Sequence, residues 1–250
     1  MSSLYSHLRL TADGRRELLA GLVARSSDTI DGRRPLLVFD LDGTLLDNRP
    51  RVVAILHELA QSWRESHPEA AAKVARARDE DIGYGLVDNL MRLGIEVPEL
   101  HAAGQRFWFE RFFIDEYLRH DTALAGAVEF ARRCHEAGAS IMYLTGRDLP
   151  KMAVGTLASL RDLGFPIGVV GTSLVTKPAF DIPDERFKRE VARELDRVGP
   201  VLAVFDNEPG NCNALLEAHP ACVSVLLDTQ HAPNPPALHS GVVVIDTFEA

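Results

Sequence analysis

Residues 36–44 read Leu-Leu-Val-Phe-Asp-Leu-Asp-Gly-Thr, an apolar run that ends in two acids, a glycine and a threonine. Near-continuous apolarity of this length is typical of a strand buried on both faces, as in a parallel sheet. Because side chains two apart on a strand point the same way, Asp40 and Asp42 share a side. They lie at the strand's carboxyl end, where open α/β sheets bind ligands, and Gly43 allows the chain to turn sharply. The stretch predicts a buried strand that brings two carboxylates to a binding edge.

Other apolar runs of similar length follow, and helical patterns separate several of them. One helical pattern runs from a capping Asp148 to Leu163, and another from about Pro183 to Val198. The alternation predicts an α/β fold, a Rossmann-like doubly wound parallel sheet. Its further strands are expected at Ser140–Leu144, Ile167–Gly171, Val201–Phe205, Cys222–Leu227 and Val242–Ile245.

Residues 47–120 interrupt this rhythm, because they contain helical patterns and no convincing strand. We expect an inserted all-helical cap domain there, between core segments 35–46 and 121–250. Residues 1–34 form an N-terminal helical extension, whose amphipathic helix at Arg15–Arg25 docks on the core or on a second subunit. The expected cap helices are Val52–Trp63, Glu69–Arg78, Tyr84–Leu93 and Leu100–Leu118.

Composition narrows the class of protein. A net charge of −9 gives no support to a nucleic-acid partner, which usually meets a basic surface. The three cysteines lack metal-ligand spacing and are expected to be reduced thiols. No stretch approaches the length of a membrane span, and the N-terminus has no signal-peptide pattern. These features predict a soluble cytoplasmic protein, and they leave its oligomeric state open.

The pair Asp40 and Asp42 carries the first chemical prediction. Two neighbouring carboxylates repel, so the arrangement favours a bound cation, and hard oxygen ligands favour Mg²⁺. One acid can then act as a nucleophile while the other gives and takes a proton. The alternative is that Asp-Gly-Thr only makes a turn, but two acids, Gly43 and Thr44 at this spacing after a buried strand favour the functional interpretation.

A second segment, Leu144-Thr-Gly-Arg147, places a hydroxyl and a glycine at a strand end just before a helix. That arrangement suits phosphate binding by Thr145 and the backbone of Gly146. Arg147 either binds phosphate or pairs on the surface. A third segment ends the run Val201–Phe205 with Asp206, which is expected beside Asp40.

These segments closely resemble the motifs of the haloacid dehalogenase-like superfamily, most of whose members are phosphatases. The resemblance runs from Leu36 to about Thr229 and implies that Asp40 forms an aspartyl-phosphate while Asp42 is the general acid/base. It implies that Asp206 binds Mg²⁺ together with Asp40 and the backbone carbonyl of Asp42. Members that dehalogenate carbon substrates lack the second acid, so Asp42 favours phosphoryl chemistry.

Two details of the resemblance stay open. Either Lys188 or Lys177 can supply the family's lysine, and we prefer Lys188 because an early helical turn holds it toward the site. Where commoner patterns carry a second metal-binding acid, this chain has Asn207, Glu208 and Asn211; Glu208 is either that acid or a cap of the helix that opens at Pro209.

The expected protein is a magnesium-dependent phosphohydrolase that cleaves a phosphomonoester of a small metabolite. Phosphate is expected to contact Thr44, Thr145, Gly146 and Lys188. The alternatives are a phosphotransferase or phosphomutase with the same site, and a non-catalytic phosphate-binding regulatory protein. The aromatic cluster Phe107–Phe113 is interpreted as cap core rather than as a platform for substrate stacking.

Overall fold

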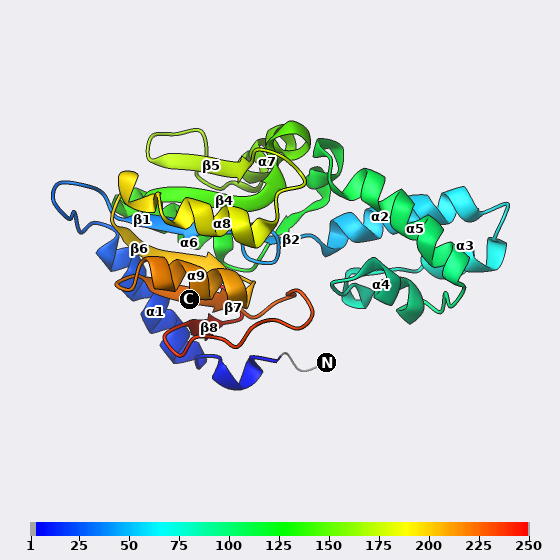
Figure 1. Cartoon of the computed structure of the whole chain (residues 1–250), viewed down its shortest axis with the longest axis horizontal. Helices are drawn as coiled ribbons and strands as arrows, with labels where there is room; N and C mark the ends of the chain where they lie inside the picture. The colour runs from blue at the N-terminus through cyan, green and yellow to red at the C-terminus, as the bar shows by residue number, and fades with distance from the viewer. Residues whose placement is uncertain (1–3, 250) are drawn as a thin grey trace. The chain divides into compact units, whose positions relative to one another are not determined.

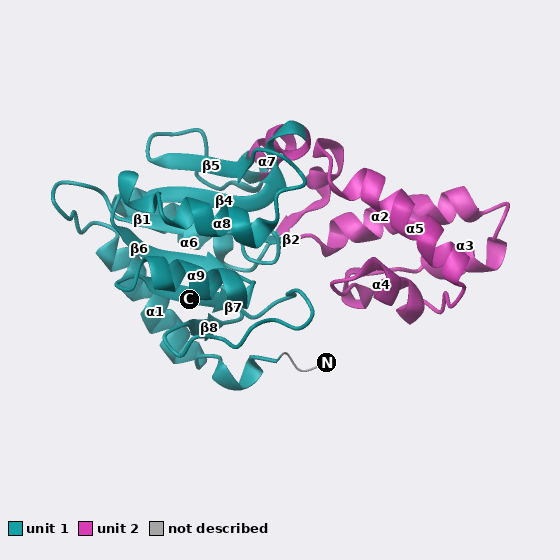
Figure 2. Cartoon of the chain, viewed as in Figure 1, with its two compact units in different colours: residues 1–46, 123–150, 160–250 teal, residues 47–122, 151–159 magenta. Residues whose placement is uncertain are grey.

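The computed structural model describes residues 4–249 and divides the chain into two compact units (Figure 2). The α/β unit contains residues 1–46, 123–150 and 160–250, and the helical unit contains residues 47–122 and 151–159. The chain crosses between them at β2 (Leu46–Asp47) and β3 (Thr122–Ala123), which pair as a two-stranded sheet. Residues 47–122 are therefore inserted between the first strand of the α/β unit and the rest of that unit, and residues 151–159 form a second segment of the helical unit.

A six-stranded parallel sheet forms the centre of the α/β unit, in the order β5-β4-β1-β6-β7-β8 (Figure 1). Its central strand β1 is fully buried, as its run of apolar side chains predicted. The chain moves outward from β1 in both directions, which is the doubly wound arrangement. The strands are β1 (Leu36–Phe39), β4 (Ser140–Asp148), β5 (Thr172–Lys177), β6 (Val201–Asp206), β7 (Val223–Leu227) and β8 (Val243–Ile245).

Helices cover both faces of this sheet. On one face Leu19, Leu22 and Phe130 join the apolar side chains of β1, β4 and β6 in one buried cluster. On the other face Phe187 and Leu215 pack on the opposite side chains of the same strands. The helices of this unit are α1 (Ala12–Arg25), α6 (Ala127–Ala137), α8 (Asp184–Ala192) and α9 (Pro209–Ala218), with short 3₁₀ turns η1 (Ser6–Leu8) and η4 (Leu195–Arg197). Helix α7 (Leu149–Leu163) is divided, because its residues 151–159 belong to the helical unit.

The N-terminal segment is part of the α/β unit. Helix α1 docks on the core through Leu19 and Leu22, which was one of the two expected partners. Ahead of it, Leu10 donates its backbone N–H to the carbonyl of Val244, so the segment adds to the outer side of β8. Arg9 forms an ion pair with the buried Asp228 at the end of β7. Residues 4–25 thus follow one edge and one face of the sheet.

Two sequence predictions in this unit were wrong. The strand expected at Ile167–Gly171 is a pair of turns, because Gly168 and Gly171 adopt φ angles of +73° and +84°. The strand follows it as β5, where Thr172–Lys177 pairs with β4. The helix expected from Pro183 to Val198 stops at Ala192, after which the chain tightens into η4.

The helical unit has a core of its own, formed by apolar side chains of four helices. The fully buried Leu56, Val74 and Leu90 lie at its centre. Phe107, Trp108 and Phe112 pack against that core, whereas the side chain of Phe109 is 48% exposed. The elements are α2 (Arg49–Trp63), α3 (Pro68–Val74), α4 (Leu86–Arg92) and α5 (Pro98–Phe112), with 3₁₀ turns η2 (Asp79–Asp81) and η3 (Asp115–His120).

One ion pair is buried completely in the helical unit. Arg51 in the first turn of α2 donates Nε and Nη2 to the two oxygens of Asp121, at 2.7 and 2.6 Å. Both side chains are 0% exposed. The guanidinium also donates to the carbonyl of Phe112 and lies 4.3 Å from the centre of its ring. One positive and one negative charge therefore balance each other, and the pair ties the first helix of the unit to its last turn.

Among residues 4–249, no helix combines the length and the apolarity needed to cross a bilayer.

Candidate active site

Asp40 and Asp206 lie side by side at the carboxyl edge of the sheet. Phe39 of β1 is in register with Phe205 of β6, so the residues that follow them are neighbours. The backbone N–H of Asp40 donates to the carbonyl of Phe205 at 2.9 Å. Both acids are buried, with 6% and 1% of their surface exposed. The parallel register of two adjacent strands thus places two carboxylates together in a low-dielectric environment.

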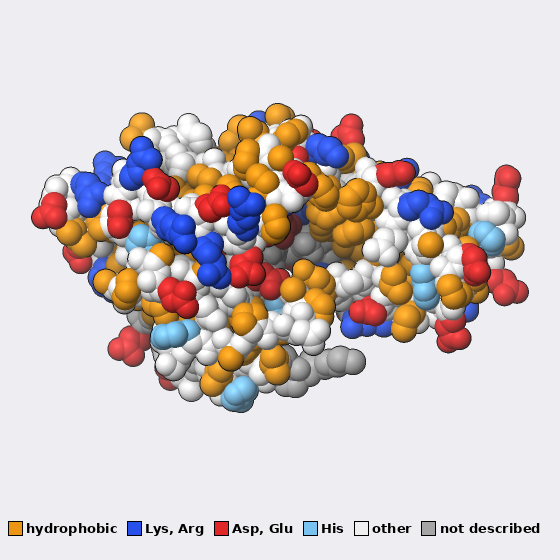
Figure 3. Space-filling model, viewed as in Figure 1, with side chains coloured by type: hydrophobic (Ala, Val, Ile, Leu, Met, Phe, Trp, Pro, Cys, Tyr) orange, Lys and Arg blue, Asp and Glu red, His pale blue; other side chains and the backbone are white. Residues whose placement is uncertain are grey.

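Lys188 joins these two carboxylates. Its Nζ lies 2.7 Å from Oδ1 of Asp40 and 2.7 Å from Oδ2 of Asp206. It comes from the second turn of α8, and its side chain turns inward while neighbouring charged side chains of the helix face solvent. Those outer side chains form pairs, Arg186 with Glu190 and Arg189 with Glu185, so acidic and basic groups are interspersed over α8 (Figure 3).

Lys177 has a different role. Its Nζ donates to the carbonyls of Phe180 and Ile182, at 3.1 and 2.9 Å, and to Asp184 at 2.6 Å. The lysine is buried and closes the loop that leads from β5 into α8. Of the two lysines considered from the sequence, Lys188 is therefore the one that contacts Asp40. The sequence did not indicate that the Lys177 side chain would bend back into its own loop.

The electrostatics of this cluster are unbalanced, because one lysine serves two carboxylates. Burial raises the pKa of Asp40 to about 7; attraction to Lys188 opposes that rise, and repulsion by Asp206 and Asp42 adds to it. Burial alone would lower the pKa of Lys188, but Asp206 and Asp40 outweigh it and raise that pKa, so the lysine stays charged. The cluster thus carries a net negative charge when both acids are ionised.

Hydrogen bonds fix both carboxylates. Thr44 donates its Oγ1 to Oδ2 of Asp40 at 3.1 Å. Asp206 accepts the backbone N–H of Glu208 at 2.9 Å, and it accepts Nδ2 of Asn211 on both oxygens at 3.1 and 3.2 Å. Sequence reasoning named Asn211 only as a departure from the family pattern. Its position two residues after Pro209 indicated the first turn of α9 but not the direction of its side chain.

The loop after β1 is held by the end of β7. Gly43 has a φ of +80°, and a Cβ there would lie 2.5 Å from the side-chain nitrogen of Asn207. Thr229 donates its hydroxyl to the carbonyl of Gly43, and Asn207 donates to the carbonyl of Gln230. Gly43 is therefore required both for the turn and for the close approach of Asn207.

The side chain of Glu208 is bound to the loop that follows β7. Its carboxylate accepts the backbone N–H of Ala232 at 2.8 Å, in the loop that follows β7. Burial raises its pKa. Glu208 occupies the N-cap position of α9 without a side-chain capping bond. Its side chain therefore does not cap the helix. The other role that the sequence left open, that of a second metal-binding acid, stays a prediction.

The Leu-Thr-Gly-Arg segment forms the end of β4. The pairing of β4 with β5 shifts register between Leu144 and Asp148, so Thr145, Gly146 and Arg147 form a local irregularity. Thr145 is buried, and its Oγ1 accepts the backbone N–H of Arg147 at 3.2 Å. Gly146 has no room for a side chain, because a Cβ would lie 2.1 Å from Oδ2 of Asp184. Such bulges redirect side chains at sheet edges.

Arg147 contacts Asp42. Its Nε and Nη2 lie 2.7 and 2.9 Å from the two oxygens of that carboxylate. The arginine is 3% exposed, so it does not pair on the surface, which was one of the two expectations. Asp42 therefore faces an arginine, while Asp40 faces a lysine, and the two acids of the Asp-Leu-Asp segment have separate partners.

The donor set at the sheet edge fits a magnesium ion. Within residues 4–249 no group of three or more histidine, cysteine, aspartate or glutamate side chains could hold a metal by itself. Mg²⁺ does not need such a cage, because it keeps several waters and uses one or two carboxylates together with substrate phosphate. Asp40 and Asp206 supply two buried carboxylates with an excess of negative charge. They are the side chains that would hold the ion.

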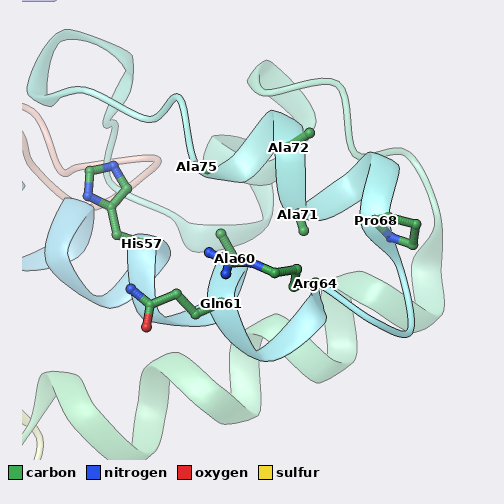
Figure 4. A pocket seen from close by; sticks show the side chains of 8 residues that line it. All are labelled: His57, Ala60, Gln61, Arg64, Pro68, Ala71, Ala72 and Ala75. Atoms are coloured by element: carbon green, nitrogen blue, oxygen red, sulfur yellow. The ribbon is translucent and has the colours of Figure 1, made fainter.

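A separate pocket in the helical unit is a poor candidate for chemistry. It has a volume of about 480 Å³ and lies between α2 and α3 (Figure 4). His57, the titratable ring among its lining side chains, contacts the carbonyl of Ala77 through Nε2 at 3.1 Å. The pocket's lining has no acid, hydroxyl or thiol: it consists of His57, Ala60, Gln61, Arg64, Pro68, Ala71, Ala72 and Ala75.

Comparison with known proteins assigns the family. The family model for haloacid dehalogenase-like hydrolases matches residues 35–218, and the chain belongs to that family. The match includes Asp40, Asp42, Thr145, Lys188 and Asp206. Comparison with curated protein sequences finds no match.

Solved structures agree on the fold. A protein from Clostridium difficile, provisionally named a phosphatase, superposes with a TM-score of 0.55 at 14% identity, over 86% of this chain and 95% of that one. A protein from Haemophilus somnus, named a predicted phosphoglycolate phosphatase, gives a TM-score of 0.51 at 14% identity, over 85% and 94% of the two chains. At such identities the likeness shows a shared fold and not a shared substrate.

Proposed function

We propose that this hydrolase is a magnesium-dependent phosphatase that cleaves a small phosphomonoester through an aspartyl-phosphate on Asp40. The observation that carries the proposal is the buried cluster of Asp40, Lys188 and Asp206, in which two carboxylates share one lysine. A site with this charge suits a divalent cation and, through it, a phosphate. Membership of the family and the matching motif positions support the same chemistry.

In the first step an oxygen of Asp40 attacks the phosphorus atom, and the bond from phosphorus to the ester oxygen breaks. Asp42 gives a proton to that leaving oxygen, so the alcohol departs neutral. In the second step Asp42 takes a proton from a water molecule, whose oxygen attacks phosphorus and frees Asp40. Inorganic phosphate is the second product, and both acids return to their starting state.

Charge on the transferring group is stabilised by residues at the same sheet edge. Lys188 is charged and fixed beside Asp40, so it can neutralise phosphate oxygens without reorganising. Thr145 and the backbone of Gly146 are the proposed hydrogen-bond donors to phosphate. Thr44 was expected to contact phosphate as well, but its hydroxyl donates to Asp40 and its backbone N–H to the carbonyl of Leu41, so its proposed role is to orient the nucleophile. A magnesium ion held by Asp40, Asp206 and the backbone carbonyl of Asp42 would supply Lewis-acid neutralisation of the phosphate.

The test is phosphate release from a panel of phosphorylated metabolites and from p-nitrophenyl phosphate. We expect release with Mg²⁺, loss of release in excess chelator, and recovery when Mg²⁺ is restored. Calcium should inhibit, because its longer bonds and larger coordination number would misplace Asp40 relative to phosphorus. Full activity in excess chelator would contradict the metal assignment. Transfer of the phosphoryl group to a second alcohol, in place of release, would identify a phosphotransferase.

A further inference from the structure

The arginine that follows Thr145 and Gly146 is engaged with an acid and not open to solvent. Arg147 presents one edge of its guanidinium, Nε and Nη2, to the two oxygens of Asp42 at 2.7 and 2.9 Å. The arginine side chain is 2% exposed, whereas the carboxylate of Asp42 is 28% exposed. The pair therefore has a buried, rigid member and a member that reaches solvent.

This geometry fixes the orientation of the carboxylate. A planar guanidinium that binds both oxygens holds the carboxylate in its own plane, which a single ammonium contact cannot do. Each carboxylate oxygen has two lone pairs, and the arginine occupies one on each. The part of Asp42 that reaches solvent is the part that a substrate or a water molecule can meet.

The backbone holds the arginine in place for this contact. Arg147 lies in the register shift at the end of β4, where its N–H donates to Oγ1 of Thr145. Asp42 lies in the turn after β1, which Gly43 and Leu46 close with a backbone hydrogen bond of 2.8 Å. Because β1 and β4 are hydrogen-bonded neighbours, the two side chains project from adjacent strand ends.

We infer that Arg147 is a positioning residue for Asp42: its two-point contact sets the orientation in which Asp42 protonates the leaving oxygen and deprotonates water. The inference rests on the proposed function, because it needs Asp42 as the acid and base of the reaction. It differs from direct phosphate binding by Arg147, in which the guanidinium would contact the transferring group itself.

The two roles predict different dependence on the leaving group. An alkyl phosphate releases a strongly basic oxygen that needs a proton, whereas p-nitrophenolate leaves without one. Loss of positioning should therefore harm kcat/KM for glycerol phosphate and spare kcat/KM for p-nitrophenyl phosphate. Loss of a phosphate-binding group should harm both esters equally and weaken inhibition by inorganic phosphate.

The experiment measures kcat/KM for both esters in the wild type, Arg147→Lys, Arg147→Gln and Asp42→Asn. Arg189→Gln is the matched control, because Arg189 is an exposed arginine paired with Glu185 on α8. For Arg147→Lys we expect a loss of about hundredfold on the alkyl ester, the scale of a misplaced catalytic group, and less than about threefold on the aryl ester. Asp42→Asn should show the same pattern with a larger loss, and the control should match the wild type.

If one of the single variants folds poorly, a double-mutant cycle still tests the inference. In the Asp42→Asn background the replacement of Arg147 by Gln should add little to the alkyl-ester loss, because the group it positions is already gone. The double variant also leaves no uncompensated charge at the pair.

Three outcomes overturn the inference: equal losses on the two esters, full additivity in the cycle, or weaker inhibition by inorganic phosphate in Arg147→Lys. Failure of the proposed function gives a different result, since Asp40→Asn would then retain turnover or the wild type would release no phosphate.

Discussion

Each unit of this protein contains a buried ion pair, and the two differ in charge balance. In the helical unit Arg51 and Asp121 form a one-to-one pair in which both side chains are 0% exposed. In the α/β unit Lys188 serves both Asp40 and Asp206. The first pair is electrically complete and needs nothing further. The second has an excess carboxylate, and a burial cost of this kind persists where function requires it. Both ion pairs are buried, so burial does not distinguish them. They differ in charge balance, because the pair in the helical unit is neutral and the cluster in the α/β unit has one carboxylate more than it has lysines.

The largest effect that this comparison predicts is on Asp40. Asp40→Asn should lower turnover by about 10⁴-fold or more, the scale of removing a nucleophile, because an amide is a poor nucleophile and a weak metal ligand. The fold should survive, since Lys188 keeps Asp206 as a partner. Steady-state phosphate release and circular dichroism of the same sample measure the two effects. A variant that turns over at near wild-type rate would exclude Asp40 as the nucleophile.

The balanced pair should give the opposite result. Arg51→Met leaves Asp121 buried without its cation, which typically costs 3–5 kcal/mol. Denaturant unfolding should detect that loss, while turnover below the unfolding transition should change little. Replacing both partners, Arg51→Met with Asp121→Leu, should recover most of the stability because no charge stays uncompensated. If the double variant were as unstable as the single one, the pair would contribute more than charge neutralisation.

The two lysines provide the next test. Lys188→Ala should slow turnover by about a hundredfold or more, because losing a cation that stabilises the transition state costs about 2–4 kcal/mol. Lys177→Ala should leave the chemical step nearly unchanged. It should lower the melting temperature instead, because Lys177 binds two loop carbonyls and Asp184. A larger loss of turnover in Lys177→Ala than in Lys188→Ala would transfer the role to Lys177.

The last expected effect concerns the pH dependence of stability. The pKa of Asp40 rises from 3.8 to about 7 on folding, so the folded chain holds a proton that the unfolded chain releases. The free energy of unfolding of the metal-free protein should therefore fall as pH rises from about 4 to 7. The Asp40→Asn variant has no carboxyl at this position, so its stability does not decrease in this way as pH rises. Its melting temperature should therefore exceed that of the wild type at pH 8 and lie closer to the wild-type value at pH 5. Thermal melts in chelator at both pH values measure the difference.

The sequence predicted most of the fold because its signals were local and strong. The run before Asp40 and its spacing to Asp42 indicated both a buried strand and the binding edge. The strand wrongly predicted at Ile167–Gly171 shows the limit of such local signals. Two glycines with positive φ angles turn the chain within this apolar run. The apolarity of a run does not determine its backbone dihedral angles. The more polar run Thr172–Lys177 gave a weaker signal and still formed the strand.

The site was predictable in its acids and less so in its partners. Asp40 and Asp206 follow from strand ends, which a parallel sheet brings together. The choice of Lys188 needed the helix start, which the sequence also supplied. The ion pair of Arg147 with Asp42 and the amide of Asn211 on Asp206 depend on side-chain directions across separate strands. Those directions are set by the register shift in β4 and the first turn of α9, which sequence spacing does not determine.

The short strand β8 ends the sheet, and the segment around Arg9 and Leu10 covers its outer side. An uncovered strand edge offers unpaired N–H and C=O groups to any other chain, and this is a common origin of aggregation. The N-terminal segment therefore shields this edge of the sheet from pairing with other chains, a role that is independent of catalysis. A truncation that removes this segment should lower solubility and yield before it affects the chemistry of the protein that stays folded. Purification tags and start sites should therefore leave residues 4–10 intact.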